Sequence, residues 1–235
     1  MLGRRYFYSS RQDLIGDLDW KDLITRSTSI FIQAGEILRL SDVETVLEVG
    51  SLRGILTSIL KHFKISVTTA DIEEIPFLNS PDHLCSLDNL KSATSQRFDL
   101  VCAFQVLEHN PVEKIEEHLL AMKDLSNKYV FISLPYDGFW FTPFILCNLP
   151  KTNKLLKAIS NIFSFRINKP KIFSKAIQSN VNQEPTMSHQ FELGSYFSHE
   201  MLISVANNVE LKLIKMFFNP YYPYHQFFLF KKNEP

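Results

Sequence analysis

The sequence predicts an α/β protein in which helices cover both faces of a doubly wound, mainly parallel sheet. Short apolar runs that are typical of buried parallel strands alternate with segments whose apolar residues recur at helical spacing. Strands and helices that alternate in this way favour right-handed crossovers. The chain has 235 residues, of which 45% are hydrophobic, so we expect one domain with a sizeable core.

Three strands of the first part end at a residue that suits a turn or a polar edge, namely Gly50, Asp71 and Pro135. Pro111 suits the first turn of a helix. In chain order we expect a helix over 20–38, a strand over 46–50, a helix over 54–63, a strand over 65–70, a weak strand at 84–85, a strong strand over 98–104, a helix from Pro111 and a strand over 129–134.

Near the C-terminus the predicted order changes to helix, strand, strand. Ser198 is a good N-cap for the helix. The two strands are expected over 209–218 and 226–231, joined by a turn over 219–223 that contains two prolines. This order predicts an antiparallel hairpin after the alternating part.

Residues 138–183 interrupt the alternation. They contain no Asp or Glu but seven Lys and Arg, which surround an apolar stripe at helical spacing. We interpret this basic, aromatic insertion as a lid that closes over an anionic or amphiphilic substrate, or that rests on an anionic membrane surface. The alternative is a packed helical lid whose lysines are only a solvated face.

Composition excludes several function classes. The chain has 25 basic and 25 acidic residues, whereas a protein that mainly binds nucleic acid usually has a large basic excess. Its three cysteines are scattered and form no metal-ligand spacing with histidine, so we expect reduced thiols and no metal site. No signal peptide is evident, and the most apolar run, 139–149, is shorter than the ~20 residues of a membrane span. We therefore expect a cytoplasmic protein.

Three segments carry the candidate chemistry, and each follows a predicted strand. In open α/β sheets, ligands bind beyond the carboxyl ends of the strands. The first segment is LEVGSLRG at 47–54, where Gly50 permits a sharp turn and Gly54 close packing at the helix start. The second is Asp71, whose carboxylate can accept hydrogen bonds from two ribose hydroxyls, with Glu73 and Glu74 as competitors.

The third segment is FDLVCAFQVLEHNP at 98–111. Together, these ordered motifs resemble the SAM-binding half of class I S-adenosylmethionine (SAM)-dependent methyltransferases, in particular the bacterial methyltransferase type 11-like group, which has VLEH after its fourth strand. The resemblance is strongest over 44–137 and weaker over 188–194 and 219–232. It implies a Rossmann-like, seven-stranded sheet with a C-terminal antiparallel hairpin and an insertion after strand five.

The same resemblance implies one methyltransferase domain over 1–235, and S-adenosyl-L-methionine as its cofactor. Within this domain we expect an N-terminal helical cover (1–40), a SAM-binding half (41–137), a lid insertion (138–190) and a C-terminal helix with strands (191–235). The expected contacts run along the cofactor. They are Glu48, Gly50, Ser51 and Gly54 at the methionine end, Asp71 on the ribose, Ile72 on the adenine, Ser86 and Leu87 at the adenine edge, and the backbone of Phe104 and Gln105.

Two departures from the family pattern concern the glycine loop and the third strand. Leu52 stands where the family usually has a middle glycine, Arg53 replaces a small residue, and Ser86 replaces an acidic residue. These changes favour one alternative, a degenerate binding or scaffold protein that keeps the fold. A nicotinamide-dependent oxidoreductase would require GxGxxG, and this loop has only Gly50 and Gly54.

The expected reaction is methyl transfer to a small-molecule, sugar- or lipid-like acceptor, at oxygen rather than elsewhere. A hydroxyl acceptor calls for a general base, and the candidates are His109, His189 and Glu192. The last two are three residues apart in SHQFELG, so a helical turn would bring them to one side. The alternatives are a loop histidine that caps the next helix, for His109, and an ordinary polar loop for the other two.

Overall fold

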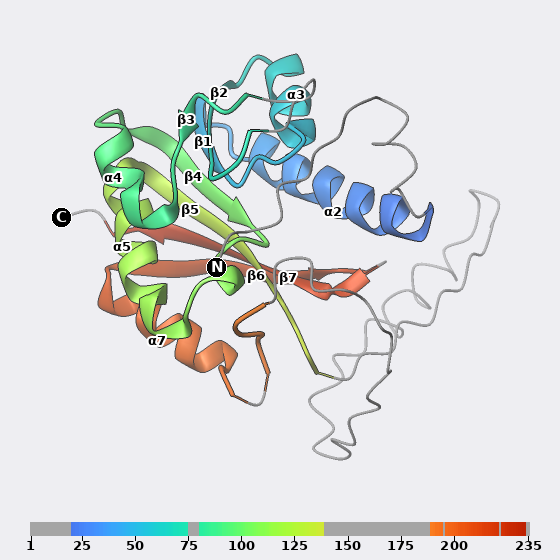
Figure 1. Cartoon of the computed structure of the whole chain (residues 1–235), viewed down its shortest axis with the longest axis vertical. Coiled ribbons are helices and arrows are strands. Elements are labelled where there is room, and N and C mark those ends of the chain that lie inside the picture. Colours follow the sequence, from blue (N-terminus) through green and yellow to red (C-terminus); the bar gives the residue numbers. More distant parts are fainter. Residues whose placement is uncertain (1–19, 75–79, 139–188, 195, 221, 234–235) are drawn as a thin grey trace, which may run out of the picture. The chain divides into compact units, whose positions relative to one another are not determined.

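A computed structural model describes residues 20–74, 80–138, 189–194, 196–220 and 222–233. These residues form one sheet with helices on both of its faces (Figure 1). Among the described helices, none is both long and apolar enough to cross a bilayer. The basic insertion lies outside the described residues, so the lid and membrane predictions concern a part of the chain that the structure does not address.

The observed elements follow the predicted order closely. Helix α2 and strand β4 have the predicted bounds, and the other predicted elements begin and end within a few residues of theirs, except at the C-terminal hairpin. The elements are α2 (Trp20–Leu38), β1 (Thr45–Val49), α3 (Ile55–His62), β2 (Ser66–Asp71), β3 (His83–Leu84), η1 (Leu87–Asn89), α4 (Leu90–Ala93), β4 (Phe98–Phe104), η2 (Leu107–His109), η3 (Val112–Lys114), α5 (Ile115–Leu125), β5 (Ser126–Pro135), α7 (His199–Asn208), β6 (Leu211–Asn219) and β7 (Tyr222–Lys232).

The sheet confirms the predicted fold class. Its seven strands lie in the order β3-β2-β1-β4-β5-β7-β6. Strands β1 to β5 pair in parallel, and β7 pairs antiparallel with both β5 and β6. The order reverses between β1 and β4, because β2 and β3 lie on one side of β1 and the later strands on the other. Such a switch point is where ligands bind in doubly wound sheets.

Two apolar layers hold the helices to the sheet, one on each face. Successive strand residues point to opposite faces, so Val46 belongs to the layer that includes α2 and α3, while Leu47 belongs to the layer that includes α4, α5 and α7. Large buried aromatic side chains fill both layers of the C-terminal hairpin, with Phe227 on the first face and Phe228 on the second. The strands whose ends carry the candidate site are thus packed on both faces.

The predicted turn over 219–223 is wrong in length. Strand β7 already begins at Tyr222, and Asn219 at the end of β6 pairs with it. The Asn219 side chain is fully buried and donates to the hydroxyls of Thr28 and Ser29 on α2, at 3.0 and 2.9 Å. This long-range anchor keeps the strand pairing intact up to a tight turn.

Candidate active site

The loop between β1 and α3 has the left-handed conformation that its glycines allow. Gly50 has a φ of 75°, and a Cβ atom there would lie 2.3 Å from Cγ2 of Val106. Its amide donates to the carbonyl of Ala70 on β2, at 2.8 Å. Gly54 has a φ of 64° where it caps α3. The sharp turn predicted at Gly50 is consistent with this geometry, and the close packing predicted at Gly54 stays a prediction.

Leu52 takes the conformation of the glycine that it replaces. Its φ is 41°, and the residue is 49% exposed. The amide of Leu52 donates to Oδ2 of Asp71 at 2.8 Å. A left-handed leucine is strained by about 1–2 kcal/mol. The departure from the family pattern therefore adds backbone strain to the loop.

Asp71 ties this loop to the end of β2. Its two carboxylate oxygens accept from the amides of Leu52, at 2.8 Å, and Glu73, at 3.2 Å. A carboxylate offers about four lone-pair positions, so Asp71 can still accept hydrogen bonds from a ligand. The next side chain, Ile72, is apolar yet 53% exposed. An acceptor group and an apolar surface thus stand together at the strand end.

Glu48 places a buried carboxyl group beneath the glycine loop. It lies in β1, is 6% exposed and accepts a hydrogen bond from the hydroxyl of Thr57 on α3. Burial raises its pKa to about 7, and the neighbouring charge of Asp71 acts in the same direction, against the hydrogen bonds from Thr57. A cation above the loop would favour the ionised form of this group.

The remaining residues that we expect to contact the cofactor differ in burial and in hydrogen bonding. Ser86 precedes η1 and accepts from the side chain of Asn89 at 3.3 Å. Leu87 is 5% exposed and belongs to the core, and Phe104 packs edge-on against another core ring. Gln105, just past β4, has a φ of 57° and bonds to Ser133. Leu87 and Phe104 could therefore border a ligand mainly through their backbones, whereas Ser51 is buried within the loop.

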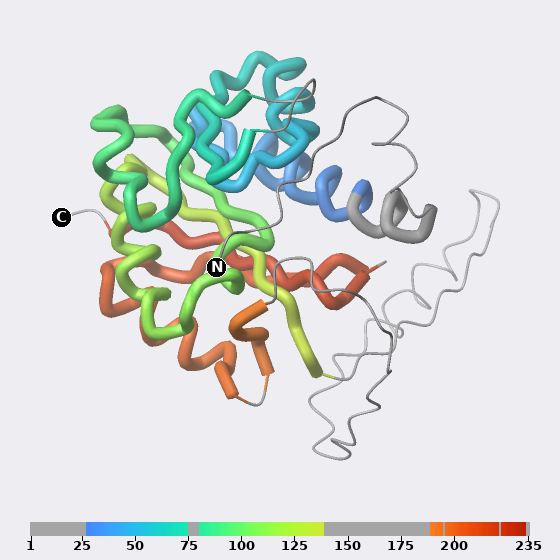
Figure 2. The backbone as a smooth tube through the Cα atoms, viewed as in Figure 1, coloured from blue at the N-terminus to red at the C-terminus, as the bar shows by residue number. Residues whose placement is uncertain are grey.

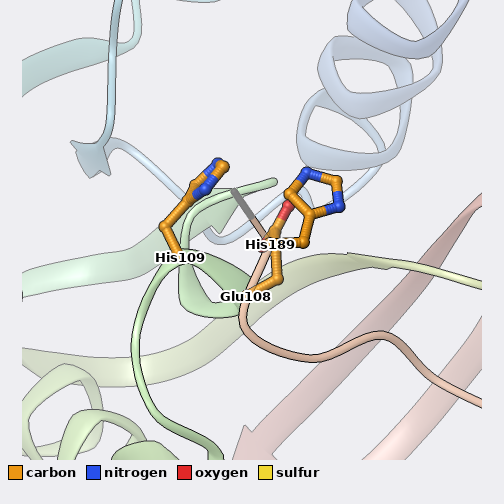
Figure 3. Close-up of side chains that lie close together, drawn as sticks. All are labelled: Glu108, His109 and His189. Atoms are coloured by element: carbon orange, nitrogen blue, oxygen red, sulfur yellow. The ribbon is translucent and has the colours of Figure 1, made fainter. Parts of the chain in front are cut away.

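The structure brings together the three residues proposed as general bases. Nδ1 of His189 lies 3.0 Å from Oε1 of Glu192. The ring centroids of His109 and His189 are 5.0 Å apart, and Figure 3 shows these two side chains. The predicted helical turn is wrong, because residues 189–192 form a bend without helix. Nor does the structure give His109 the role of a helix cap, since Pro111 caps the next short helix.

Backbone hydrogen bonds hold these segments side by side. The amide of Gln190 donates to the carbonyl of Glu108 at 2.7 Å, and its side-chain amide donates to the carbonyl of His109 at 3.3 Å. Leu193 donates to the carbonyl of Pro135, at the end of β5. The orange segment after residue 188 consequently runs beside the green turn after β4 (Figure 2).

Two residues of this cluster were missed in the sequence. The hydroxyl of Tyr224 donates to Oε1 of Glu192 at 2.6 Å and lies 3.2 Å from Nδ1 of His189. Glu108 is fully buried between His109 and the core. Glu108 stands within the VLEH motif, which could have indicated it. Tyr224 lies among several tyrosines, and no local pattern distinguishes it.

The electrostatics of the cluster separate the two histidines. The hydrogen bond to Glu192 raises the pKa of His189, and the same bond lowers the pKa of Glu192. Burial, followed by the charge of His189, lowers the pKa of His109. Burial also raises the pKa of Glu108, to about 8. Near neutral pH, His109 is an uncharged imidazole beside a histidine–carboxylate pair.

Comparison with known proteins gives matches among solved structures only. No protein-family model matches the sequence, and neither does any curated protein. Magnesium protoporphyrin IX methyltransferase from Synechocystis PCC 6803, solved with bound SAH, is similar with a TM-score of 0.57 at 14% identity, over 92% of this chain and 89% of that one.

A second similar structure is the 1,6-didemethyltoxoflavin-N1-methyltransferase of Burkholderia thailandensis. It has a TM-score of 0.56 at 15% identity, over 95% of this chain and 87% of that one. Both likenesses extend over nearly the whole length of each chain, and the sheet order with its C-terminal hairpin agrees with them. The chain therefore has the Rossmann-like fold of class I SAM-dependent methyltransferases.

Proposed function

We propose that the protein transfers a methyl group from SAM to a small-molecule acceptor, at an oxygen atom. One observation carries the proposal. The glycine loop, the buried Glu48 and the Asp71 carboxylate lie together at the switch point of the sheet. The similar solved structures that share this fold are methyltransferases. This arrangement favours SAM over a nicotinamide cofactor, because the loop lacks the GxGxxG pattern that a nicotinamide-dependent oxidoreductase would require.

The residues at the strand ends suit SAM as a ligand. Asp71 retains acceptor capacity for ribose hydroxyls, Ile72 offers an exposed apolar surface for adenine, and Glu48 is a buried acid that a cationic methionine end would ionise. SAM, when bound, supplies a methyl group on a positively charged sulfur. The chain contributes mainly alignment and exclusion of water, which can be worth ~7–11 kcal/mol of the barrier.

The histidine cluster supports oxygen as the methylated atom. An alcohol or phenol is a poor nucleophile until its proton is removed, and a positioned base contributes about 10²–10⁴-fold. We assign this role to His189. Its Nδ1 is hydrogen-bonded to Glu192, and Tyr224 donates a hydrogen bond to the same carboxylate. The other ring nitrogen, Nε2, is therefore the atom that accepts the proton. A neutral amine acceptor already has a free lone pair and would need this pair less.

Small molecules are also the acceptors that the names of the similar enzymes state, a magnesium porphyrin and a toxoflavin precursor. A sugar- or lipid-like acceptor, closed in by the basic insertion, remains part of this proposal, as does peripheral contact of that insertion with an anionic membrane. We also propose a cytoplasmic location. Both described cysteines, Cys85 and Cys102, are free thiols.

The proposal is tested by measuring S-adenosylhomocysteine release from SAM in the presence of pooled phenols, sugars and lipid-like alcohols. We expect turnover with at least one pool. His189→Ala should lower kcat by about 10²–10⁴-fold while leaving SAM binding intact, and His62→Ala, an exposed histidine on α3, should change neither. SAM binding without turnover in any pool would favour the scaffold alternative, whereas equal kcat in wild type and His189→Ala would exclude the assigned base.

A further inference from the structure

Three potential metal ligands meet at the acceptor side of the site. They are a carboxylate oxygen of Glu108 and one ring nitrogen each of His109 and His189, and these atoms all lie within 4.8 Å of one another (Figure 3). Two of the residues end the turn after β4, and the third comes from the segment that leads to α7. We propose that these three side chains bind a divalent first-row transition-metal ion of the zinc class.

Glu108 and His109 have buried polar atoms that a metal ion would satisfy. Glu108 is fully buried, and neither of its carboxylate oxygens has a hydrogen-bond partner on another described residue. Nδ1 of His109 is buried and has none among the described residues either. Buried carboxyl groups in proteins are usually paired with a charge, hydrogen-bonded or bound to a metal ion, because burial without a partner destabilises the folded state. Two adjacent residues with unmet bonding capacity face the same third side chain.

His189 has the outer contacts that are usual for a metal-binding histidine. A ligating imidazole donates its second ring N–H to a carboxylate or carbonyl, which fixes the tautomer and the ring orientation. Nδ1 of His189 lies 3.0 Å from Oε1 of Glu192, and Tyr224 donates to the same oxygen at 2.6 Å. This arrangement directs the lone pair of the other ring nitrogen, Nε2, away from Glu192. The amide of Gln190, bonded to the carbonyl of Glu108, fixes the segment further.

The ligand set indicates the class of metal. Two imidazole nitrogens and one carboxylate oxygen suit zinc and related first-row ions, whereas magnesium and calcium prefer oxygen ligands alone. Three protein ligands leave a coordination position open. If the proposed function holds, an acceptor hydroxyl could take that position, where the ion would lower its pKa. A ligating imidazole cannot also accept a proton, so the ion would then replace His189 as the activating group.

Metal binding is tested directly with the purified full chain after removal of bound metal by a chelator. Co²⁺ is titrated in and followed by its visible absorption, and Zn²⁺ is then added to displace it. We expect one Co²⁺ per chain, displaced by one Zn²⁺. Glu192→Gln, which keeps all three ligands, should weaken binding by about 10–100-fold, and His189→Ala, which removes one, by at least ~100-fold.

Two controls keep the result decisive. His62→Ala removes an exposed histidine of α3 and should leave the affinity unchanged. Glu108→Gln should weaken binding as strongly as His189→Ala; if this buried substitution prevents folding, the exposed His189→Ala decides alone. Absence of stoichiometric Co²⁺ binding by wild type, or equal affinity of wild type and His189→Ala, would overturn the proposal. Calorimetric titration of the same samples with S-adenosylhomocysteine tests the methyltransferase function separately.

Discussion

At the scale of single residues, the site combines groups whose chemistry depends on burial. Glu48 and Glu108 are both almost fully buried, and burial raises the pKa of each, to about 7 and about 8. Asp71, by contrast, is only partly buried and is held by two backbone amides. The proposed cofactor side thus has a half-buried carboxyl group at its edge and a buried one, Glu48, beneath it, whose charge depends on pH and on what binds above.

Glu48 should make the free energy of unfolding depend on pH. Its folded pKa, about 7, exceeds the unfolded value of 4.5, so its contribution to stability is fully present below pH 4.5 and is lost as pH rises to 7. Glu48→Gln stays neutral and can still accept from Thr57. Its stability relative to wild type should therefore increase between these pH values, by at most about 1.4 kcal/mol per pH unit, and level off above.

Urea unfolding at several pH values measures this difference. Glu44→Gln, at an exposed carboxylate just before β1, serves as the matched control and should show no such increase. A stability difference between Glu48→Gln and wild type that does not change with pH would contradict the assignment of a raised pKa to Glu48.

At the scale of elements, the turns after β1 and β4 form one unit. Val106, which follows β4, lies where a side chain at Gly50 would have to go. Gly50→Ala should therefore destabilise the protein twice, through a left-handed φ of 75° and through the contact with Val106. Together we expect about 2–5 kcal/mol.

A double-mutant cycle separates the two causes. Val106→Ala, added to Gly50→Ala, should relieve the contact but not the backbone strain, so the two substitutions should couple favourably in urea unfolding. Val106→Ala alone gives the reference. Strict additivity of the two changes would mean that these turns do not touch as described.

Elements were also where sequence-based prediction succeeded best. Buried parallel strands are continuous apolar runs, and the helices between them have clear periodicity, so α2 and β4 were predicted at their observed bounds. Ser198 was predicted as an N-cap, and its hydroxyl accepts from the amide of Met201 at 3.2 Å. The start of β7 at Tyr222 was missed, because proline and asparagine indicate a turn locally while the buried Asn219 anchor depends on a distant helix.

At the scale of the whole molecule, the candidate site has one part whose position follows from the sequence and one part that depends on long-range folding. The proposed cofactor half lies within one continuous stretch, where strand ends meet by topology alone, so the sequence could predict that these residues lie at one edge of the sheet. The proposed acceptor half joins residues from the turn after β4, the segment before α7 and strand β7. Glu108, His189 and Tyr224 meet only through long-range folding, and the role of Tyr224 in particular had no signal in the sequence.

The central claim is that the glycine loop and Asp71 bind SAM, and calorimetric titration with S-adenosylhomocysteine tests it most directly. Wild type should bind one equivalent, and Asp71→Ala should bind at least about tenfold more weakly, because charge-assisted hydrogen bonds contribute about 1.5–3 kcal/mol. Glu73→Gln, at the neighbouring carboxylate, is the matched control and should bind like wild type. No detectable binding by wild type at high protein concentration, or equal binding by wild type and Asp71→Ala, would contradict the claim.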